Sequence, residues 1–378
     1  MERRFDVSEV VEIPQVKNGR KVRKVLLTII ASMLSIVVVV VSGVFIYMNS
    51  IGINYVETEN SDETINENNN NSVYVEELAE DDYDSINMIK YVRSNSDTKS
   101  LLYNWYSNDG AHMKSKNVLN ILIVGIDASG GEAMKGNSDV MMLASINRKE
   151  QKITLCSFLR DSYTYYENNS GNGIYSKINA AFANGGADTL MRAIEKNYKI
   201  ELDYFVAVDF EAFEKVIEAI DGININLTKA EANEIKSMTG SSVEYGENVL
   251  LNGKQALAFA RIRRLYTTAD VQRTENQRKI INAIIKKSKT LGIADLNNVI
   301  QTLGEYIYTD CPSTKMLSLG TNAILGKWYN YQVYSMEAPP ESAREAYEGP
   351  PWLWIVDYPY SAQHVQKQIF GKSNIIIE

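Results

Sequence analysis

The sequence predicts an α/β protein of the α+β kind, with a central mixed β-sheet flanked by helices and carried on an N-terminal single-pass membrane anchor. A continuous run over residues 118–126, apolar except for Asn120, is rich in β-branched side chains, which is typical of a strand buried on both faces. Two further apolar runs, 140–146 and 152–158, are separated by five polar residues, a spacing that predicts a hairpin. Strand and helix patterns then follow one another, as they do in layered folds.

The anchor is predicted from residues 25–48, which are 24 consecutive residues without a charge. A helix of that length spans roughly 36 Å and crosses a hydrocarbon core of about 30 Å. The run is longer than the apolar region of a signal peptide, and no A-x-A cleavage pattern follows it. Residues 1–24 carry seven basic and four acidic side chains. The positive-inside rule therefore predicts a cytoplasmic N-terminal tail and an extracytoplasmic chain after residue 48.

Residues 49–116 are predicted to form a stalk. Its first half is rich in Asn and Glu and too polar to bury a core. Residues 55–84 hold eleven acidic side chains and no basic one, so this stretch accounts for the formal net charge of −8. In the second half, the spacing of apolar residues suits short helices that pack on the following domain.

Residues 117–290 are predicted to form the main folded domain. After the first three strands, the pattern predicts a helix at 187–197, a strand at 202–210, a helix at 211–220, a strand at 223–227 and a helix at 274–290. On the last helix, the expected apolar side consists of Ile280, Ile281, Ile284 and Ile285. Residues 291–378 contain an aromatic-rich segment and a closing helix. We expect them to complete or flank the core rather than to contact glycan by aromatic stacking.

The composition excludes several classes of protein. Two cysteines, Cys156 and Cys311, rule out a disulfide scaffold and a four-cysteine zinc site, and the sequence leaves open whether they pair with each other. The two histidines lie far apart in the sequence and belong to no motif, which argues against a histidine-rich metal site. The acidic balance argues against nucleic-acid binding, which usually requires a basic surface.

Three charged residues lie at the ends of the first three strands. Asp127 follows the first strand, Asp139 precedes the second, and Arg160 follows the third. A hairpin centred near Lys149 places Asp139 opposite residue 159 or 160, and Asp127 emerges at the same edge if the first and third strands run parallel. Ligands often bind at such a strand edge. For a single Asp, capping of a solvated turn is the competing interpretation.

A second charged cluster lies between residues 261 and 277. Arg261 and Arg263 point to one side if their segment is extended, and Arg273 and Gln277 are four residues apart on one helical face. Several guanidinium groups aimed at one place indicate a phosphate or carboxylate ligand. The competing interpretation is a set of surface salt bridges with nearby acidic side chains.

The order of these motifs identifies a resemblance. NILIVGIDAS, GNSDVMMLASINRKEQKITLCSFLRDSY, SKINAAFANGG, LDYFVAVDFEAFEKVIEAIDGININL, LNGKQALAFARIR and DVQRTENQRKII occur in this order over residues 117–290. Together they resemble the LytR-CpsA-Psr family of bacterial cell-envelope enzymes, and residues 117–290 are then its catalytic domain. The resemblance implies a phosphotransferase that attaches glycopolymers such as teichoic acids or capsular polysaccharides to peptidoglycan. The polymer comes from an undecaprenyl diphosphate carrier at the membrane, and Mg²⁺ or Mn²⁺ assists.

The resemblance also implies roles for individual residues. Asp127 and Asp139 are similar to the carboxylates that hold the metal and, with Arg160, to catalytic residues. The expected pyrophosphate ligands are Arg160, Arg261, Arg263, Arg273 and Gln277. Lys177 and Asn179, in SKINAAF, match a motif whose role is structural or close to the phosphates.

Two positions depart from the family's pattern. Asn137 stands where many members have Arg, so one cationic contact to phosphate is missing, and Lys135 is a candidate to replace it. Asn276 stands where Arg is common before the Gln. With the other arginines present, we still expect an active enzyme.

Two other functions compete with the transferase. A pyrophosphatase would use the same residues with water as the nucleophile. A transcription attenuator would need DNA contact, yet only the 24 residues of the basic tail are expected in the cytoplasm. We therefore expect no nucleic-acid partner.

Overall fold

The protein is described by a computed structural model, in which the described residues all belong to one compact unit, residues 51–378. They are 54–56, 98–108, 110–126, 136–266, 269–288, 306–349 and 351–375. The predicted anchor at 25–48, Asp127 and Lys135 lie outside the described residues. Among the helices of the described ranges, none has both the length and the apolar character needed to cross a bilayer.

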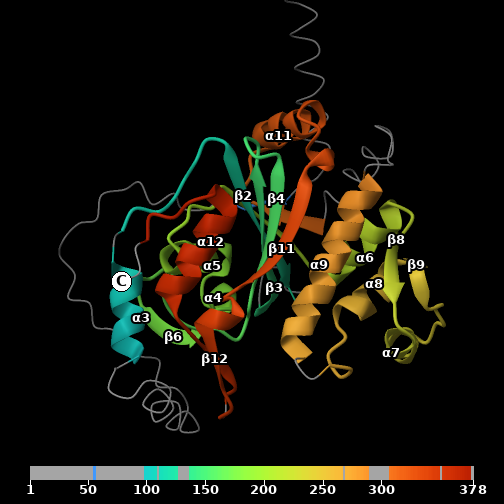
Figure 1. The fold of residues 1–378 in the computed structure, drawn as a ribbon, viewed down its shortest axis with the longest axis horizontal. Coiled ribbons are helices and arrows are strands. Elements are labelled where there is room, and N and C mark those ends of the chain that lie inside the picture. Colours follow the sequence, from blue (N-terminus) through green and yellow to red (C-terminus); the bar gives the residue numbers. More distant parts are fainter. Residues whose placement is uncertain are drawn as a thin grey trace, which may run out of the picture. The chain divides into compact units, whose positions relative to one another are not determined.

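Within the described residues, a seven-stranded mixed sheet forms the centre of the unit (Figure 1). In spatial order its strands are β1 (Asn54–Tyr55), β10 (Ile307–Thr309), β7 (Tyr204–Val208), β2 (Val118–Ile126), β3 (Ser138–Asn147), β4 (Lys152–Phe158) and β11 (Gln332–Ala338). β2, β3 and β4 are antiparallel neighbours, whereas β7 runs parallel to β2 and β11 runs parallel to β4. The prediction of a mixed sheet is therefore confirmed.

Helices cover both faces of this sheet, as predicted (Figure 1). One face packs against α3 (Thr98–Ser107), α4 (Ala180–Ala183), α5 (Gly186–Tyr198) and α12 (Tyr358–Phe370). Its core includes fully covered side chains such as Leu122, Phe158, Tyr198 and Phe205. Two hairpins, β5 (Tyr163–Glu167) with β6 (Gly173–Lys177) and β12 (Arg344–Tyr347) with β13 (Leu353–Val356), lie outside the central sheet.

The other face packs against α9 (Ala269–Ser288), beyond which lies a smaller layer. That layer consists of α6 (Phe210–Ala219), α7 (Lys229–Thr239), α8 (Gly253–Ala260) and the hairpin of β8 (Ile223–Leu227) and β9 (Gly246–Leu251). The remaining helix, α11 (Ser313–Leu325), is followed by short 3₁₀ turns at Trp328–Asn330 and Glu341–Ala343.

The isoleucines of α9 do not share one environment, so the prediction of a single apolar side was wrong. Ile280 and Ile284 pack with β8 and α8, whereas Ile281 and Ile285 pack with the central sheet. Consecutive positions on a helix are about 100° apart, so a buried helix can serve two cores. α9 is therefore a wedge between the sheet and the small layer.

Some strands and helices begin or end at other residues than predicted. The strand predicted at 202–210 ends at Val208, because Asp209 accepts a hydrogen bond from the Ala212 amide and begins α6 as its N-cap. The helix predicted at 274–290 begins at Ala269. The strand predicted at 223–227 is present but belongs to a separate two-stranded sheet.

The chain after residue 290 supplies two strands of the central sheet. β11 pairs with β4 from Gln332 opposite Lys152 to Ala338 opposite Phe158, and β10 pairs with β7 on the other side. The two cysteines are buried and free in the structure. Cys156 lies within β4, and Cys311 follows β10.

Gly125, near the end of β2, allows β2 and β3 to approach closely where they reach the cavity described below. A Cβ placed on Gly125 would lie 2.8 Å from the Cβ of Val140, and the β2–β3 register shifts between Gly125 and Ile126. No larger residue fits without moving β3.

We expect Gly125→Ala to lower the free energy of unfolding by about 1–3 kcal/mol, because an added methyl group overpacks this contact. The matched control is Gly320→Ala in α11, where an added Cβ meets nothing within 4 Å; it should be neutral or stabilise by up to about 1 kcal/mol. Urea unfolding of both variants is the measurement. Equal stabilities would show that β3 yields easily at this contact.

Candidate active site

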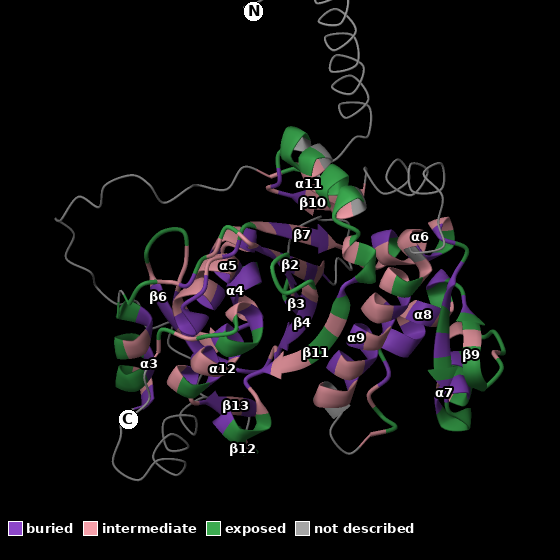
Figure 2. Cartoon of the chain, turned by 45° about the horizontal axis from the view of Figure 1, so that its top comes forward, coloured by how far each residue is buried: buried purple, intermediate pink, exposed green. Residues whose placement is uncertain are grey.

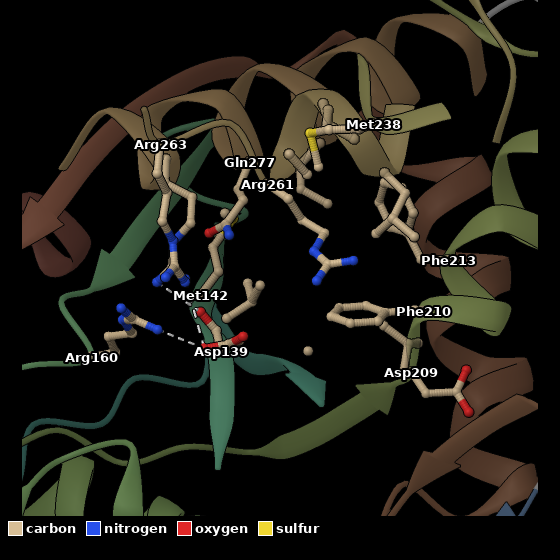
Figure 3. A pocket seen from close by; sticks show the side chains of 18 of the residues that line it. Asp139, Met142, Arg160, Asp209, Phe210, Phe213, Met238, Arg261, Arg263 and Gln277 are labelled. Carbon is tan, nitrogen blue, oxygen red and sulfur yellow. Dashed lines mark hydrogen bonds and ion pairs between the residues drawn. The ribbon is translucent and has the colours of Figure 1, made fainter. Parts of the chain in front are cut away.

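A cavity of about 660 Å³ opens between the central sheet, α9 and the small layer (Figure 3). Part of its wall carries charged groups, namely the carboxylates Asp139, Asp209 and Glu234 and the arginines Arg160, Arg261, Arg263, Arg264 and Arg273. Another part is apolar and includes Ile123, Val140, Met142, Phe213, Met238 and Leu257. The cavity therefore offers positive charge and apolar surface to the same ligand.

Asp139 and Arg160 meet because of the β3–β4 register. Met142 pairs with Ser157, so continuing the antiparallel ladder sets Asp139 opposite Arg160, as the predicted hairpin requires. Arg160 Nη1 donates to Asp139 Oδ1 at 2.9 Å, a contact visible in Figure 3. Both side chains remain partly exposed to the cavity, at 21% and 27%.

Arg273 approaches the same carboxylate from α9. Its Nη1 lies 3.7 Å from Asp139 Oδ1, and its Nη2 donates to the Asp139 carbonyl oxygen at 3.3 Å. The Arg273 side chain is only 3% exposed. Two guanidinium groups therefore share one carboxylate.

Lys177 and Asn179 do not line the cavity, but they bind residues that support the Arg160–Asp139 ion pair. Lys177 Nζ donates to Asp161 Oδ1 at 2.7 Å, and Asp161 Oδ2 lies 3.3 Å from Arg160 Nε. The Asn179 amide donates to the Arg160 carbonyl oxygen, and the Asn179 carbonyl oxygen accepts from the Ser138 amide, both at 3.3 Å. Of the two roles considered for this motif, the geometry supports the structural one.

Arg261 and Arg263 line the cavity, although their segment is not extended as the sequence analysis assumed. Asn252 and Gln255 form a capping box that starts α8, and Arg261 is the C-cap residue with helical backbone angles. Ile262, between the two arginines, is fully buried. Because Ile262 points into the core, the arginine side chains on either side of it point toward the cavity. The Arg261 guanidinium lies over the Phe210 ring, 4.7 Å from its centroid, a favourable cation–π contact.

Gln277, one turn after Arg273 on α9, also lines the cavity, as its predicted helical face requires. Asn137 is exposed and is not part of the cavity wall. Asp127 is outside the described residues, but its neighbour Ile126 pairs with Ser138, next to Asp139. Within the described residues, no group of three Asp, Glu, His or Cys side chains is arranged to hold a metal ion.

The segment that carries the arginines is held at both ends by Asn276. Asn276 is fully buried, and its Nδ2 donates to the Phe259 carbonyl oxygen and to the Tyr266 hydroxyl oxygen, each at 3.4 Å. Tyr266 in turn donates to Glu231 Oε1 at 2.6 Å. Phe259 and Tyr266 bracket the segment, so one amide on α9 ties down its start and its end.

Glu231 is the last residue in the series of hydrogen bonds that runs from Asn276 through Tyr266. It also belongs to the capping box of α7. Its Oε2 accepts from the Thr228 amide and hydroxyl, both at 2.7 Å. Burial alone would raise the pKa of Glu231, but the hydrogen bonds from Tyr266 and Thr228 outweigh it, so the pKa lies below its ordinary value. Burial and the adjacent Glu231 carboxylate raise the pKa of Tyr266 to about 12.

Sequence reasoning did not find Tyr266 and Glu231. The Thr-x-x-Glu spacing of residues 228–231 is a capping-box signature that could have indicated the start of α7, a helix that the sequence analysis did not predict. Nothing in the local pattern indicated that this Glu also receives a hydrogen bond from a residue 35 positions later.

Comparison with known proteins identifies the family of the chain. The LytR_cpsA_psr family profile matches residues 56–350. The chain belongs to the LytR_cpsA_psr family. The match begins well before the 117–290 segment whose motifs suggested the family, and it ends well after it.

Two relatives of known function illustrate the similarity. The chain is 31% identical over 211 residues to the polyisoprenyl-teichoic acid–peptidoglycan teichoic acid transferase TagU of Halalkalibacterium halodurans, an alignment that covers 56% of this chain and 66% of the relative. It is 30% identical to TagV of Bacillus subtilis, over 56% of this chain and 54% of TagV. The chain thus spans slightly less than two thirds of the length of the first of these curated relatives.

Solved structures of the family share the fold. The structure described as "TagT bound to LI-WTA" is 25% identical and superposes with a TM-score of 0.55, over 70% of this chain and 97% of TagT. The protein gbs0355 from Streptococcus agalactiae is also 25% identical, with a TM-score of 0.57 over 70% of this chain and 94% of that one.

The departure from the family's pattern at position 276 has a structural explanation. Asn276 is enclosed between α8, α9 and Tyr266 rather than facing the cavity, and it is not part of the cavity wall. The Glu231 carboxylate beyond it is hydrogen-bonded by Tyr266. In this chain, neutral donors therefore hold the arginine-bearing segment.

We expect Tyr266→Phe to lower the free energy of unfolding at pH 7 by about 1.5–3 kcal/mol, the usual cost of losing a hydrogen bond to a charged group. The effect should depend on pH. Because folding lowers the Glu231 pKa below 4.5, this stabilisation is present above that value and is lost as the pH falls through the folded pKa. Urea unfolding at pH 7 and below pH 4 is the measurement.

The control is Tyr245→Phe, since Tyr245 is 60% exposed and should not respond. A deficit in Tyr266→Phe that stayed constant with pH would mean that the hydroxyl stabilises the fold without Glu231.

Proposed function

We propose that this protein is a membrane-anchored phosphotransferase that attaches an anionic glycopolymer from an undecaprenyl diphosphate carrier to peptidoglycan. The observation that carries the proposal is the two-part cavity, in which arginines around Asp139 adjoin an apolar wall. A prenyl diphosphate has the same two parts, an anionic head and an apolar chain. The names of the similar proteins TagU and TagV, which are transferases of this kind, support the same function.

The diphosphate would bind among the arginines. Arg261 and Arg263 enter the cavity from the end of α8, while Arg160 and Arg273 approach from β4 and α9. Guanidinium groups bind phosphate oxygens through paired N–H groups. Five arginines and three carboxylates are among the described residues that line the cavity, so the lining favours an anion, and the prenyl chain would extend along Met142, Phe213 and Met238.

The reaction needs little covalent help from the protein. A sugar hydroxyl oxygen of peptidoglycan attacks the phosphorus attached to the glycopolymer, and the bond from that phosphorus to the bridging oxygen breaks. The bridging oxygen leaves with the bond's electron pair as part of undecaprenyl phosphate, and the hydroxyl proton passes to a carboxylate. Arg160 engages Asp139 through Oδ1 alone, so we assign this base to Asp127 or Asp139. The arginines stabilise the charge that develops on the phosphate oxygens.

The donor set suits a Mg²⁺ or Mn²⁺ ion. Asp139 Oδ2 receives no hydrogen bond from the described residues, and a carboxylate oxygen facing phosphate is a hard ligand of the type that Mg²⁺ prefers. We propose that Asp139 and Asp127 hold the ion together with substrate oxygens. The ion would add positive charge next to the diphosphate. Chelation of Mg²⁺ should then weaken diphosphate binding by the wild type but leave binding by Asp127→Asn unchanged.

The orientation follows from the charge pattern before the apolar segment. Seven basic side chains precede residues 25–48, so we place the N-terminal tail in the cytoplasm and the folded unit outside the cell membrane. Protease added to intact protoplasts should digest everything beyond residue 48 and spare a small N-terminal fragment. A protected folded unit would reverse the orientation and remove access to peptidoglycan.

For the diphosphate site, we expect Arg261→Gln and Arg263→Gln each to weaken binding of a polyprenyl diphosphate by about 10- to 100-fold. Truncating one partner of a buried charge pair costs about 2–5 kcal/mol, and partial exposure of these two arginines reduces this toward about 1.4–2.8 kcal/mol, or one to two decades. Calorimetric titration of the full chain in detergent is the measurement.

The control for this titration is Arg148→Gln, at the turn end of the β3–β4 hairpin, where its side chain donates to the Lys116 carbonyl oxygen. If the two cavity variants bound as tightly as this control, the diphosphate site would be elsewhere. If bound carrier were cleaved to free phosphates with no polymer joined to peptidoglycan, the protein would be a pyrophosphatase.

A further inference from the structure

The β12–β13 hairpin has one face buried in the core and one face that carries tryptophans. Leu353 and Ile355 of β13 are 2% and 4% exposed and belong to the core of the main layer. Because side chains alternate along a strand, Trp352 and Trp354 lie on the opposite side, and their rings meet edge to face at 4.7 Å. Both tryptophans are partly exposed.

Backbone contacts join this hairpin to the residues that follow β4, directly after Arg160. The Trp354 amide donates to the Asp161 carbonyl oxygen at 2.9 Å, and Trp354 forms an isolated parallel bridge with Ser162. Asp161 follows Arg160, whose guanidinium holds Asp139. In Figures 1 and 2, the hairpin projects beside the end of β11, at the sheet edge where β4 also ends.

An ion pair links the tryptophan side of the hairpin to the side of β11 that faces α9. Val333 packs with the sheet residues beneath α9, and Ser335 accepts a hydrogen bond from Asn282 of α9. By alternation, Glu337 lies on this side too. Arg344 Nη1 lies 2.8 Å from Glu337 Oε1, and its guanidinium stacks 4.7 Å from the Trp354 ring centroid.

We propose that Trp352 and Trp354, supported by Arg344, form the platform that holds the saccharide acceptor beside the diphosphate site. This inference rests on the proposed function and adds to it the acceptor's binding surface. The occupant is a glycan strand of peptidoglycan, approaching from the edge of the sheet that carries Arg160.

The chemistry of the platform suits a sugar ring. A pyranose has a face of C–H groups that packs on an aromatic ring, while its hydroxyl groups need polar partners; an indole offers an apolar body beside such partners. Glu348, in the turn of the hairpin, is exposed and can accept hydrogen bonds from hydroxyl or amide groups. Ala346, opposite Trp354 in the ladder, is small and exposed, so no large side chain of β12 lies directly opposite Trp354.

Trp354 also packs against the main core cluster, but Trp352 is not needed to hold the hairpin in place. Leu353 and Ile355 bury the other face, the ladder with β12 runs from Arg344–Val356 to Tyr347–Leu353, and the Trp354 bond to Asp161 uses only backbone atoms. Trp352 belongs to none of the buried clusters. Its side chain can therefore be changed with little effect on the fold.

The test compares Trp352→Ala with Trp352→Tyr in the full chain in detergent. Two ligands are titrated separately: soluble glycan fragments from peptidoglycan stripped of attached polymers, and a polyprenyl diphosphate. Truncating a tryptophan that anchors a ligand typically costs more than about 1 kcal/mol. We expect Trp352→Ala to weaken glycan binding by roughly tenfold, Trp352→Tyr to retain most of it, and neither variant to alter diphosphate binding.

The matched control is Tyr245→Ala, an exposed aromatic on the small layer, which should bind glycan like the wild type. Glycan affinity unchanged in Trp352→Ala, or lowered equally in Tyr245→Ala, would overturn the platform. So would an equal loss of glycan and diphosphate binding, because the effect would then be a disturbance of the whole site. If the wild type bound glycan through Trp352 but bound no polyprenyl diphosphate, the platform would stand and the proposed transferase function would fail.

Discussion

Arg160 and Asp139 form an ion pair at the end of the β3–β4 hairpin that is far from its turn. This ion pair reflects the register between β3 and β4, and the rest of the site depends on that register. Strand side chains alternate with a period of two, so a slip of one residue would turn Asp139 away from the cavity. With the register in place, Arg273 reaches the same carboxylate from α9. The β3–β4 hairpin thereby holds α9 in place. α9 lies between the sheet and the small layer, and the cavity opens between these three parts of the fold.

Among the described residues that line the cavity, five arginines outnumber three carboxylates. Asp139 is engaged by two guanidinium groups, whereas Asp161 and Glu231 do not line the cavity; Asp161 is engaged by Lys177 and Arg160, and Glu231 by Tyr266. Neutral Asn276 ties down the arginine-bearing segment without adding a charge. Positive charge is thus left on the cavity side, where an anionic ligand can neutralise it.

The C-terminal part of the chain brings a second surface to this edge. β11 runs along β4 for its whole length, and the chain then returns through the β12–β13 hairpin to meet Asp161 and Ser162. An aromatic surface far away in the sequence is thereby placed within a few residues of Arg160. For a group transfer between a lipid-linked donor and a glycan acceptor, this is where an acceptor surface is needed.

Local periodicity was enough to predict the strand at 118–126, the hairpin that sets Asp139 opposite Arg160, and the helical face shared by Arg273 and Gln277, because these features depend on neighbours a few residues apart. The order of the motifs was enough to suggest the family. Only the tertiary structure decided that the α9 isoleucines serve two cores, that Arg261 ends a helix, that Tyr266 joins Asn276 to Glu231, and that the tryptophan hairpin adjoins the site. Each of these contacts joins separate elements of the fold, and such pairings are selected by packing and by the satisfaction of buried polar groups, which local sequence patterns do not encode.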